Sequence, residues 1–168
     1  IGRFAGNFNN TGTNNTLIGF NSNVTASNFT NATAIGYNAT VAQSNSLVLG
    51  QAGTSVGIGT NAPGATLDVN GTAIIGTNGT PLTGIIRSTE VDNLPIIAAG
   101  ATSVRTYAVA NTVLGASVYV SPANGLLPGL VIAYARVSVA GSVEVGFTNT
   151  TAGNIDQASQ NYYVTVIQ

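Results

Sequence analysis

Short apolar segments that end in glycine recur at regular intervals in the first third of the chain. A six-residue segment that ends at Asn21 returns almost unchanged and ends at Asn38, and a looser copy ends at Gly50. The glycines at positions 2, 19, 36 and 50 are separated by 17, 17 and 14 residues. One apolar-apolar-glycine segment per period is typical of a solenoid, in which each coil stacks on the previous one. The pattern therefore predicts Asn-rich β-roll repeats over residues 1–55.

Each period contains a short apolar strand, a glycine and then a stretch of asparagine, threonine and serine. Glycine suits a position where the backbone turns or packs closely against another backbone. Asparagine tolerates left-handed conformations and closes turns, so we expect it at the corners of the coils. The residues expected to form the core or trimer contacts, and the turns beside them, are Ile18, Gly19, Ile35, Gly36, Leu49, Gly50 and Ile58.

A single coil offers only two or three aliphatic side chains to a core. At roughly 25 cal/mol per Å² of buried apolar surface, so few side chains cannot offset an ordering entropy of about 1 to 2 kcal/mol per residue. Three such rods side by side would share a central apolar column. This is the physical reason to expect a homotrimer.

The chain changes character after the repeats. Residues 56–90 are expected to form a connector or neck, because Asn70-Gly71 and Asn78-Gly79 are strong signals for tight turns. The first cluster of charges, Arg87, Glu90 and Asp92, lies near the end of this segment. We expect these three side chains to be solvated.

Residues 91–168 contain longer strands with alternating apolar and polar positions. Clusters of turn residues separate them, and no segment has a helical pattern. This arrangement predicts an all-β protein that ends in an antiparallel β-sandwich, similar to a jelly roll. The expected strands are 103–109, 117–120, 130–139, 142–147 and 162–167.

Composition excludes several classes of function. Only 5% of the residues are charged, no charge lies between Arg3 and Asp68, and the chain holds 20 Asn and 22 Thr. A net charge of −1 without a basic cluster argues against binding of nucleic acid. No apolar run approaches the roughly 20 residues that span a bilayer. The hydrophobic fraction of 44% argues for an ordered chain. The chain has no initiator methionine and no signal-peptide pattern, so we expect a processed product or a fragment.

The repeated segments carry a resemblance to a known group of proteins. The unit Ala34-Ile35-Gly36-Tyr37-Asn38-Ala39, with its neighbours 14 to 17 residues away, resembles the head repeats of trimeric autotransporter adhesins and the repeats of bacteriophage tail fibres. The stretch from Val56 to Pro63, followed by Leu67 to Gly71, is similar to a connector of such fibres. The resemblance covers about residues 1–75, and it implies an intertwined homotrimeric β-roll followed by a neck.

A second resemblance concerns the last third of the chain. The runs 115–122 and 146–153, together with the ending 163–166, resemble a small β-domain at the carboxyl end of tail-fibre-like proteins. That pattern has an arginine before its Phe-x-Asn element, and this chain has Gly146 there. Any binding or trimer contact made by that arginine is therefore in doubt here.

Motifs that suggest catalysis or ligand chemistry have simpler explanations. Residues 53–57 match the G-x-S-x-G nucleophile elbow, but the chain has no histidine to act as the base and no predicted helix. Residues 57–62 match a loose dinucleotide fingerprint, but Pro63-Gly64 stands where a helix should begin. Histidine and cysteine are absent, and residues 68–71 lack the remaining oxygen ligands of a calcium loop. We predict no catalytic, cofactor or metal site, and the five acidic residues make a glycosidase pair a poor prospect.

Tyrosine is the best candidate for recognition, because five of the six tyrosines lie in the second half of the chain. Tyr162 and Tyr163 are neighbours on a predicted strand, so one should lie in the core and the other at the surface. Candidate recognition residues at the tip are Tyr119, Tyr134 and Tyr162. Nine N-x-[ST] sequons could carry glycans only on a glycosylating secretion route.

These observations predict a structural, extracellular fibre protein rather than an enzyme. We expect a homotrimer that spans distance and presents its C-terminal domain to a cell-surface glycan or protein. The alternative is a subunit of an extracellular filament joined end to end, because an exposed last coil is an open edge. Ile1-Gly2 begins in mid-repeat, which fits either a truncation or such an end. Growth of fibres with concentration would distinguish a filament from an adhesin.

Overall fold

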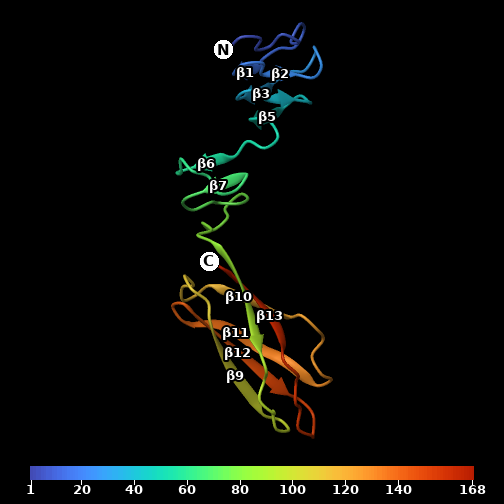
Figure 1. Ribbon diagram of the computed structural model, residues 1–168, viewed down its shortest axis with the longest axis vertical. Coiled ribbons are helices and arrows are strands. Elements are labelled where there is room, and N and C mark those ends of the chain that lie inside the picture. The colour runs from blue at the N-terminus through green and yellow to red at the C-terminus, as the bar shows by residue number, and fades with distance from the viewer. The chain divides into compact units, whose positions relative to one another are not determined.

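The computed structural model describes all residues 1–168 and is all-β, without a helix (Figure 1). The chain divides into two compact units, Ile1–Gly71 and Thr72–Gln168. The segment 56–90, expected as a separate connector, is therefore shared between the two units. No helix that could cross a membrane is present.

The first unit is a stack of short coils, as the repeats predict. Strands β1 (Thr16–Ile18), β3 (Ala32–Ile35) and β5 (Ser46–Leu49) form a parallel sheet in the order β1-β3-β5. Strands β2 (Asn23–Val24) and β4 (Thr40–Val41) form a second parallel pair. Equivalent residues of successive periods lie opposite each other, so that Ile18 pairs with Ile35 and Ile35 with Leu49. Figure 1 shows these strands lying one above the other.

The stacking pattern continues beyond the predicted repeats. Strands β6 (Val56–Ile58) and β7 (Leu67–Val69) are parallel, and Ile58 lies opposite Val69. The backbone N–H of Asn70 donates to the Ile58 carbonyl at 2.9 Å, which continues the ladder past the strands. The first part of the predicted connector is thus a further coil of the first unit.

Alternation along the strands separates an inner from an outer apolar column. Leu17, Ala34 and Val48 point inward and pack with a small core. The fully buried members of that core are Val24, Ala32, Ala34, Ala39 and Val41. Ile18, Ile35 and Leu49 follow the inward residues by one position, so they project from the other side of the sheet. Ile18, Ile35 and Leu49 were predicted for the core or the trimer contacts. In the single chain, the residue before each of them points into the core instead.

The second unit consists of two antiparallel three-stranded sheets. Strands β8 (Ile85–Asp92), β10 (Ser117–Pro122) and β13 (Gln160–Ile167) form one sheet, in the order β10-β13-β8. Strands β9 (Thr102–Ala108), β11 (Leu130–Val139) and β12 (Ser142–Asn149) form the other, in the order β11-β12-β9. Five of these six strands coincide with predicted strands to within about two residues.

One hydrophobic core joins the two sheets. It is built from the inward side chains of the central strands, Val143, Val145 and Phe147 of β12 and Tyr162, Val164 and Val166 of β13. The rings of Phe147 and Tyr162 meet edge to face, with centroids 5.2 Å apart. Aromatic pairs at this distance add about 0.5 to 1.5 kcal/mol beyond the burial of their area.

The charged cluster at the end of the predicted connector belongs to this unit. Arg87, Glu90 and Asp92 all lie on β8, which pairs with β13 along its whole length. Asp92 is only 7% exposed, so the expectation that all three side chains are solvated is wrong. Buried carboxylates need partners, and Arg105 of β9 supplies them: its Nε and Nη2 donate to the two Asp92 oxygens at 2.7 Å each.

Candidate assembly and recognition surfaces

The recurrent glycines lie in a column where successive coils touch. Gly19 and Gly36 have φ values of 129° and 123°, a region that side chains with a Cβ rarely adopt. A Cβ on Gly19 would lie 2.6 Å from the carbonyl carbon of Gly36, which is less than any real Cβ contact. Glycine is therefore required here both by backbone conformation and by the close approach of the next coil.

Asparagine forms two further columns at the corners of the coils. Asn21 and Asn38 have φ values of 55° and 53°, and the Asn21 Nδ2 donates to the Asn38 Oδ1 at 3.0 Å. The same arrangement joins Asn31 to Asn45, again at 3.0 Å. Each asparagine thus closes a left-handed turn and bonds to its equivalent in the next coil, as expected for corner residues.

The outer face of the coil sheet carries an uncovered apolar column. Three residues lie in register at the ends of β1, β3 and β5 and are exposed: Ile18 by 39%, Ile35 by 38% and Leu49 by 43%. An aromatic column runs beside it: the rings of Phe20 and Tyr37 are stacked 5.8 Å apart, and Phe4 meets Phe20 edge to face. Ile35, Tyr37 and Leu49 line one cavity of about 360 Å³, so the two columns adjoin. We call them together the coil apolar face.

Ile58 is the remaining residue predicted for the rod. It lies at the end of β6 and is more than half exposed.

The three tyrosines predicted for recognition have different environments. Tyr162 is fully buried between the sheets, so it cannot contact a receptor, and that prediction is wrong. Its neighbour Tyr163 points to the surface instead, because adjacent residues of a strand face opposite sides. Tyr119 is 62% exposed and makes no hydrogen bond with its side chain, which leaves it free for recognition.

Tyr134 is exposed but engaged within the chain. Its ring covers Gly146 of the neighbouring strand, where a Cβ would lie 2.7 Å from the ring Cδ1. Its hydroxyl donates to Glu144 at 2.9 Å, and Arg136 also bonds to this carboxylate. These hydrogen bonds lower the pKa of Glu144 and raise that of Tyr134. Gly146, directly before Phe147, thus makes room for an aromatic ring.

The surface of the sheet β10-β13-β8 that faces away from the core is the most distinctive part of the second unit. Register places Tyr119, Thr165 and Arg87 in one row across the three strands. The adjacent rows contain Ser121, Tyr163 and Thr89 on one side and Ser117, Ile167 and Ile85 on the other. Asn161 and Val91 complete this surface, which we call the outer β13 face. Its only charged residue is Arg87, because Glu90 and Asp92 lie on the opposite side of β8.

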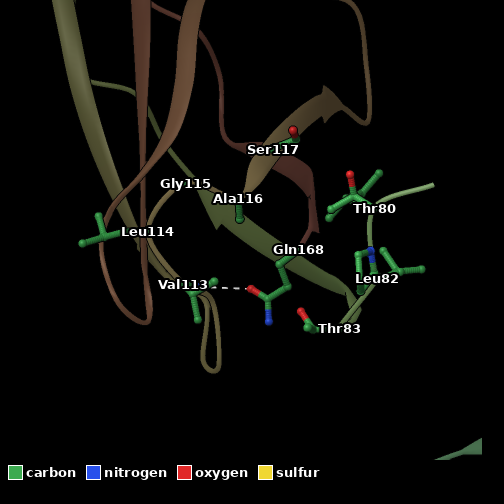
Figure 2. A pocket seen from close by; sticks show the side chains of 11 residues that line it. Thr80, Leu82, Thr83, Val113, Leu114, Gly115, Ala116, Ser117 and Gln168 are labelled. Atoms are coloured by element: carbon green, nitrogen blue, oxygen red, sulfur yellow. Dashed lines mark hydrogen bonds between the residues drawn. The ribbon is translucent and has the colours of Figure 1, made fainter. Parts of the chain in front are cut away.

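A cavity of about 460 Å³ adjoins one end of the outer β13 face (Figure 2). Ser117 and Ile167 belong to both, and the other walls are formed by the segment 80–83, by residues 113–116 and by Gln168. The Gln168 side chain holds this region in place: its Oε1 accepts from the Val113 N–H at 3.0 Å and its Nε2 donates to the Asn111 carbonyl at 3.0 Å. The lining combines aliphatic groups with the hydroxyls of Thr80, Thr83 and Ser117.

Sequence reasoning did not find the buried polar cluster of Asp92, Arg105 and Tyr107. The Tyr107 hydroxyl donates to Asp92 at 3.0 Å. Burial and this bond raise the pKa of Tyr107 well above its usual value, and the bond to Asp92 raises the pKa of Arg105. Arg105 and Tyr107 lie 13 and 15 positions after Asp92, on a strand of the other sheet, and only the packing of the two sheets brings them together.

Burial also sorts the sequons. Asn23 and Asn149 are both buried, so neither can carry a glycan in the folded chain.

No group of three or more histidine, cysteine, aspartate or glutamate side chains comes together in the structure. Comparison of the chain with protein-family models, with curated proteins and with solved structures gives no match.

Proposed function

We propose that this chain is a structural subunit of an extracellular fibre, that it acts as a homotrimer, and that its second unit attaches the fibre to a cell surface or partner. The observation that carries the proposal is the coil apolar face. Its central column of Ile18, Ile35 and Leu49 repeats once per coil and remains about two-fifths exposed in the single chain.

The small core of the coils supports association of several chains. The fully buried members of that core are only alanine and valine, whereas the large side chains of the coil apolar face stay exposed. Full burial of one isoleucine or leucine contributes about 1.5 to 3 kcal/mol, so covering the exposed two-fifths contributes about 1 kcal/mol per side chain. Three chains that share this column would gain about 3 kcal/mol at each level of the stack.

The remaining parts of the proposal rest on sequence and chemistry. The coil repeats resemble adhesin heads and tail fibres, which supports a trimeric β-roll outside the cell. The two antiparallel sheets and their common core suit a β-sandwich at the end of such a fibre. An almost uncharged surface solvated by amides and hydroxyls is compatible with a passive, structural role rather than with catalysis.

The test is the mass of the purified chain in solution, measured by sedimentation at low and high concentration and combined with negative-stain imaging. A species of three chains that persists on dilution is expected. Replacing both Ile35 and Leu49 by serine should dissociate it, whereas Val139→Ser, at an exposed aliphatic residue of β11, should leave the mass unchanged.

Two results would contradict the proposal. A folded monomer would show that the coil apolar face needs no partner chain. Growth without limit as concentration rises would instead identify a filament subunit, joined end to end.

A further inference from the structure

We propose that the outer β13 face binds an acidic saccharide, with Arg87 pairing to the sugar carboxylate and Tyr119 and Tyr163 packing against sugar rings. This inference rests on the proposed attachment role, and it assigns that role to one surface and one class of ligand.

The arginines of the second unit differ in a way that points to Arg87. Arg105 is paired with Asp92, and Arg136 is paired with Glu144. Arg87 is exposed and takes part in no ion pair and no side-chain hydrogen bond. Its guanidinium presents a planar set of donors that matches a carboxylate in a bidentate geometry.

The charge of the surrounding surface favours an anionic ligand. No acidic side chain lies on the outer β13 face, since Glu90 and Asp92 are on the inner side of β8. The Ser88 hydroxyl is bonded to Glu90 on that inner side, and Asp92 is bonded to Arg105 and Tyr107. A carboxylate that binds this face would therefore meet one unpaired cation and no negative charge that repels it.

The uncharged groups of the face suit a saccharide better than a protein. Tyr119 and Tyr163 supply two exposed rings on neighbouring strands, and a sugar presents C–H groups that pack on aromatic faces. Five hydroxyl or amide side chains surround them, from Thr89, Ser117, Ser121, Asn161 and Thr165. These groups can both donate and accept, as sugar hydroxyls do.

The dimensions of the face suit two or three linked sugars. Strands of a sheet lie about 4.8 Å apart, so the backbones that carry Tyr119 and Arg87 are about 10 Å apart across β13. The cavity beside Gln168 shares Ser117 and Ile167 with the face and adds hydroxyls at its far side (Figure 2). A bound saccharide can extend into it from the row that contains Tyr119.

The experiment measures binding of sialyllactose, trigalacturonate and neutral lactose to the full chain by calorimetry and by saturation-transfer NMR. We expect at least one acidic probe to bind more tightly than lactose. Arg87→Gln should weaken the acidic probe by about tenfold or more, because a hydrogen bond to a charged group is lost, and it should leave binding of lactose unchanged. Arg87→Lys should bind the acidic probe more tightly than Arg87→Gln but less tightly than the unchanged chain, since lysine keeps the positive charge but not the planar, bidentate set of donors.

Two further variants complete the design. Tyr119→Ala should weaken acidic and neutral probes alike, since it removes a packing surface rather than a charge. Arg136→Gln removes an arginine on the other sheet and should change neither. Melting temperatures of all variants verify that each is folded.

The inference is overturned if neither acidic probe binds more tightly than lactose, or if Arg87→Gln leaves acidic binding unchanged. It is also overturned if Arg87→Gln alters the number of chains in the assembly, because the face would then be an interface between copies. A trimer that binds no acidic probe contradicts this inference alone. A monomer that binds one contradicts the trimeric fibre alone.

Discussion

The glycine column of the coils allows a strict test of how the stack is held together. Gly19→Ala adds one methyl group at a φ of 129° and directs it against the backbone of Gly36. Neither group can relieve the overlap by rotating a side chain. The two coils must therefore separate locally.

The expected cost has two parts. A side chain held in a sparsely populated backbone conformation costs about 1 to 2 kcal/mol. Separation of the coils also weakens the bonds from the Gly36 N–H to the Ile18 carbonyl, at 2.7 Å, and from the Asn38 N–H to the Phe20 carbonyl, at 3.0 Å. Each of these contributes about 1 kcal/mol. The free energy of opening the stack should therefore fall by about 3 to 4 kcal/mol.

Two glycines of the same unit separate these contributions. Gly53 has a φ of 88° but no atom within 4 Å of the position that a methyl group would take, so Gly53→Ala should cost only the conformational part, about 1 to 2 kcal/mol. Gly71 has open space and an ordinary φ, so Gly71→Ala should be neutral or slightly stabilising.

Native-state hydrogen exchange at the amides of Gly36 and Asn38 is the assay. Gly19→Ala should accelerate exchange by about 100- to 1000-fold, since each 1.4 kcal/mol corresponds to a factor of about ten. Exchange no faster than in Gly53→Ala would refute the reasoning, because it would mean that the close approach of the coils contributes nothing.

Three other predictions concern single side chains. Asn38→Ala should lower the free energy of unfolding, measured by chemical denaturation, by about 1 to 2 kcal/mol, because alanine loses the hydrogen bond from Asn21 and must still adopt a positive φ. Asn38→Gly should cost less, because glycine adopts a positive φ without strain. An equal cost for the two variants would contradict this prediction. Asp92→Asn should destabilise the second unit by about 2 kcal/mol. This is less than the cost of breaking a fully buried ion pair, because Arg105 is about one-third exposed. An unchanged melting temperature would contradict this prediction. Because the pKa of Tyr107 is raised in the folded state, its contribution to stability is complete below about pH 10 and falls as pH rises further, when the unfolded tyrosine ionises. Tyr107→Phe should therefore reduce the loss of stability that occurs above about pH 10, and an unchanged slope there would assign the loss to other groups.

Local patterns were sufficient to predict the elements whose two faces differ. The alternating strands of the last third, such as β9 and β11, lie within about two residues of their predicted bounds. β8 was missed because polar residues occupy both of its faces: Arg87 and Thr89 point outward, while Ser88 and Glu90 point inward. A strand without an apolar face has no period-two signal.

The sequence pattern also does not determine which of two adjacent apolar residues points into the core. Leu17 and Ile18 are equally apolar, as are Val48 and Leu49, and a shift of one residue exchanges inside and outside. Tyr162 and Tyr163 are chemically identical, and Tyr162 lies in the core because the sheet that contains β12 packs on its side of β13.

The amino-acid sequence was enough to predict the period of the coils, the glycine and asparagine positions within them, and the all-β class. These properties depend on the conformational preferences of single residues and on spacing along the chain. Only the folded chain shows which aliphatic column is covered, that Asp92 meets Arg105 and Tyr107, and that Arg87 stands unpaired on the outer β13 face. Those properties depend on which strands pair and on how the two sheets of the second unit pack together, and residue preferences carry no information about either.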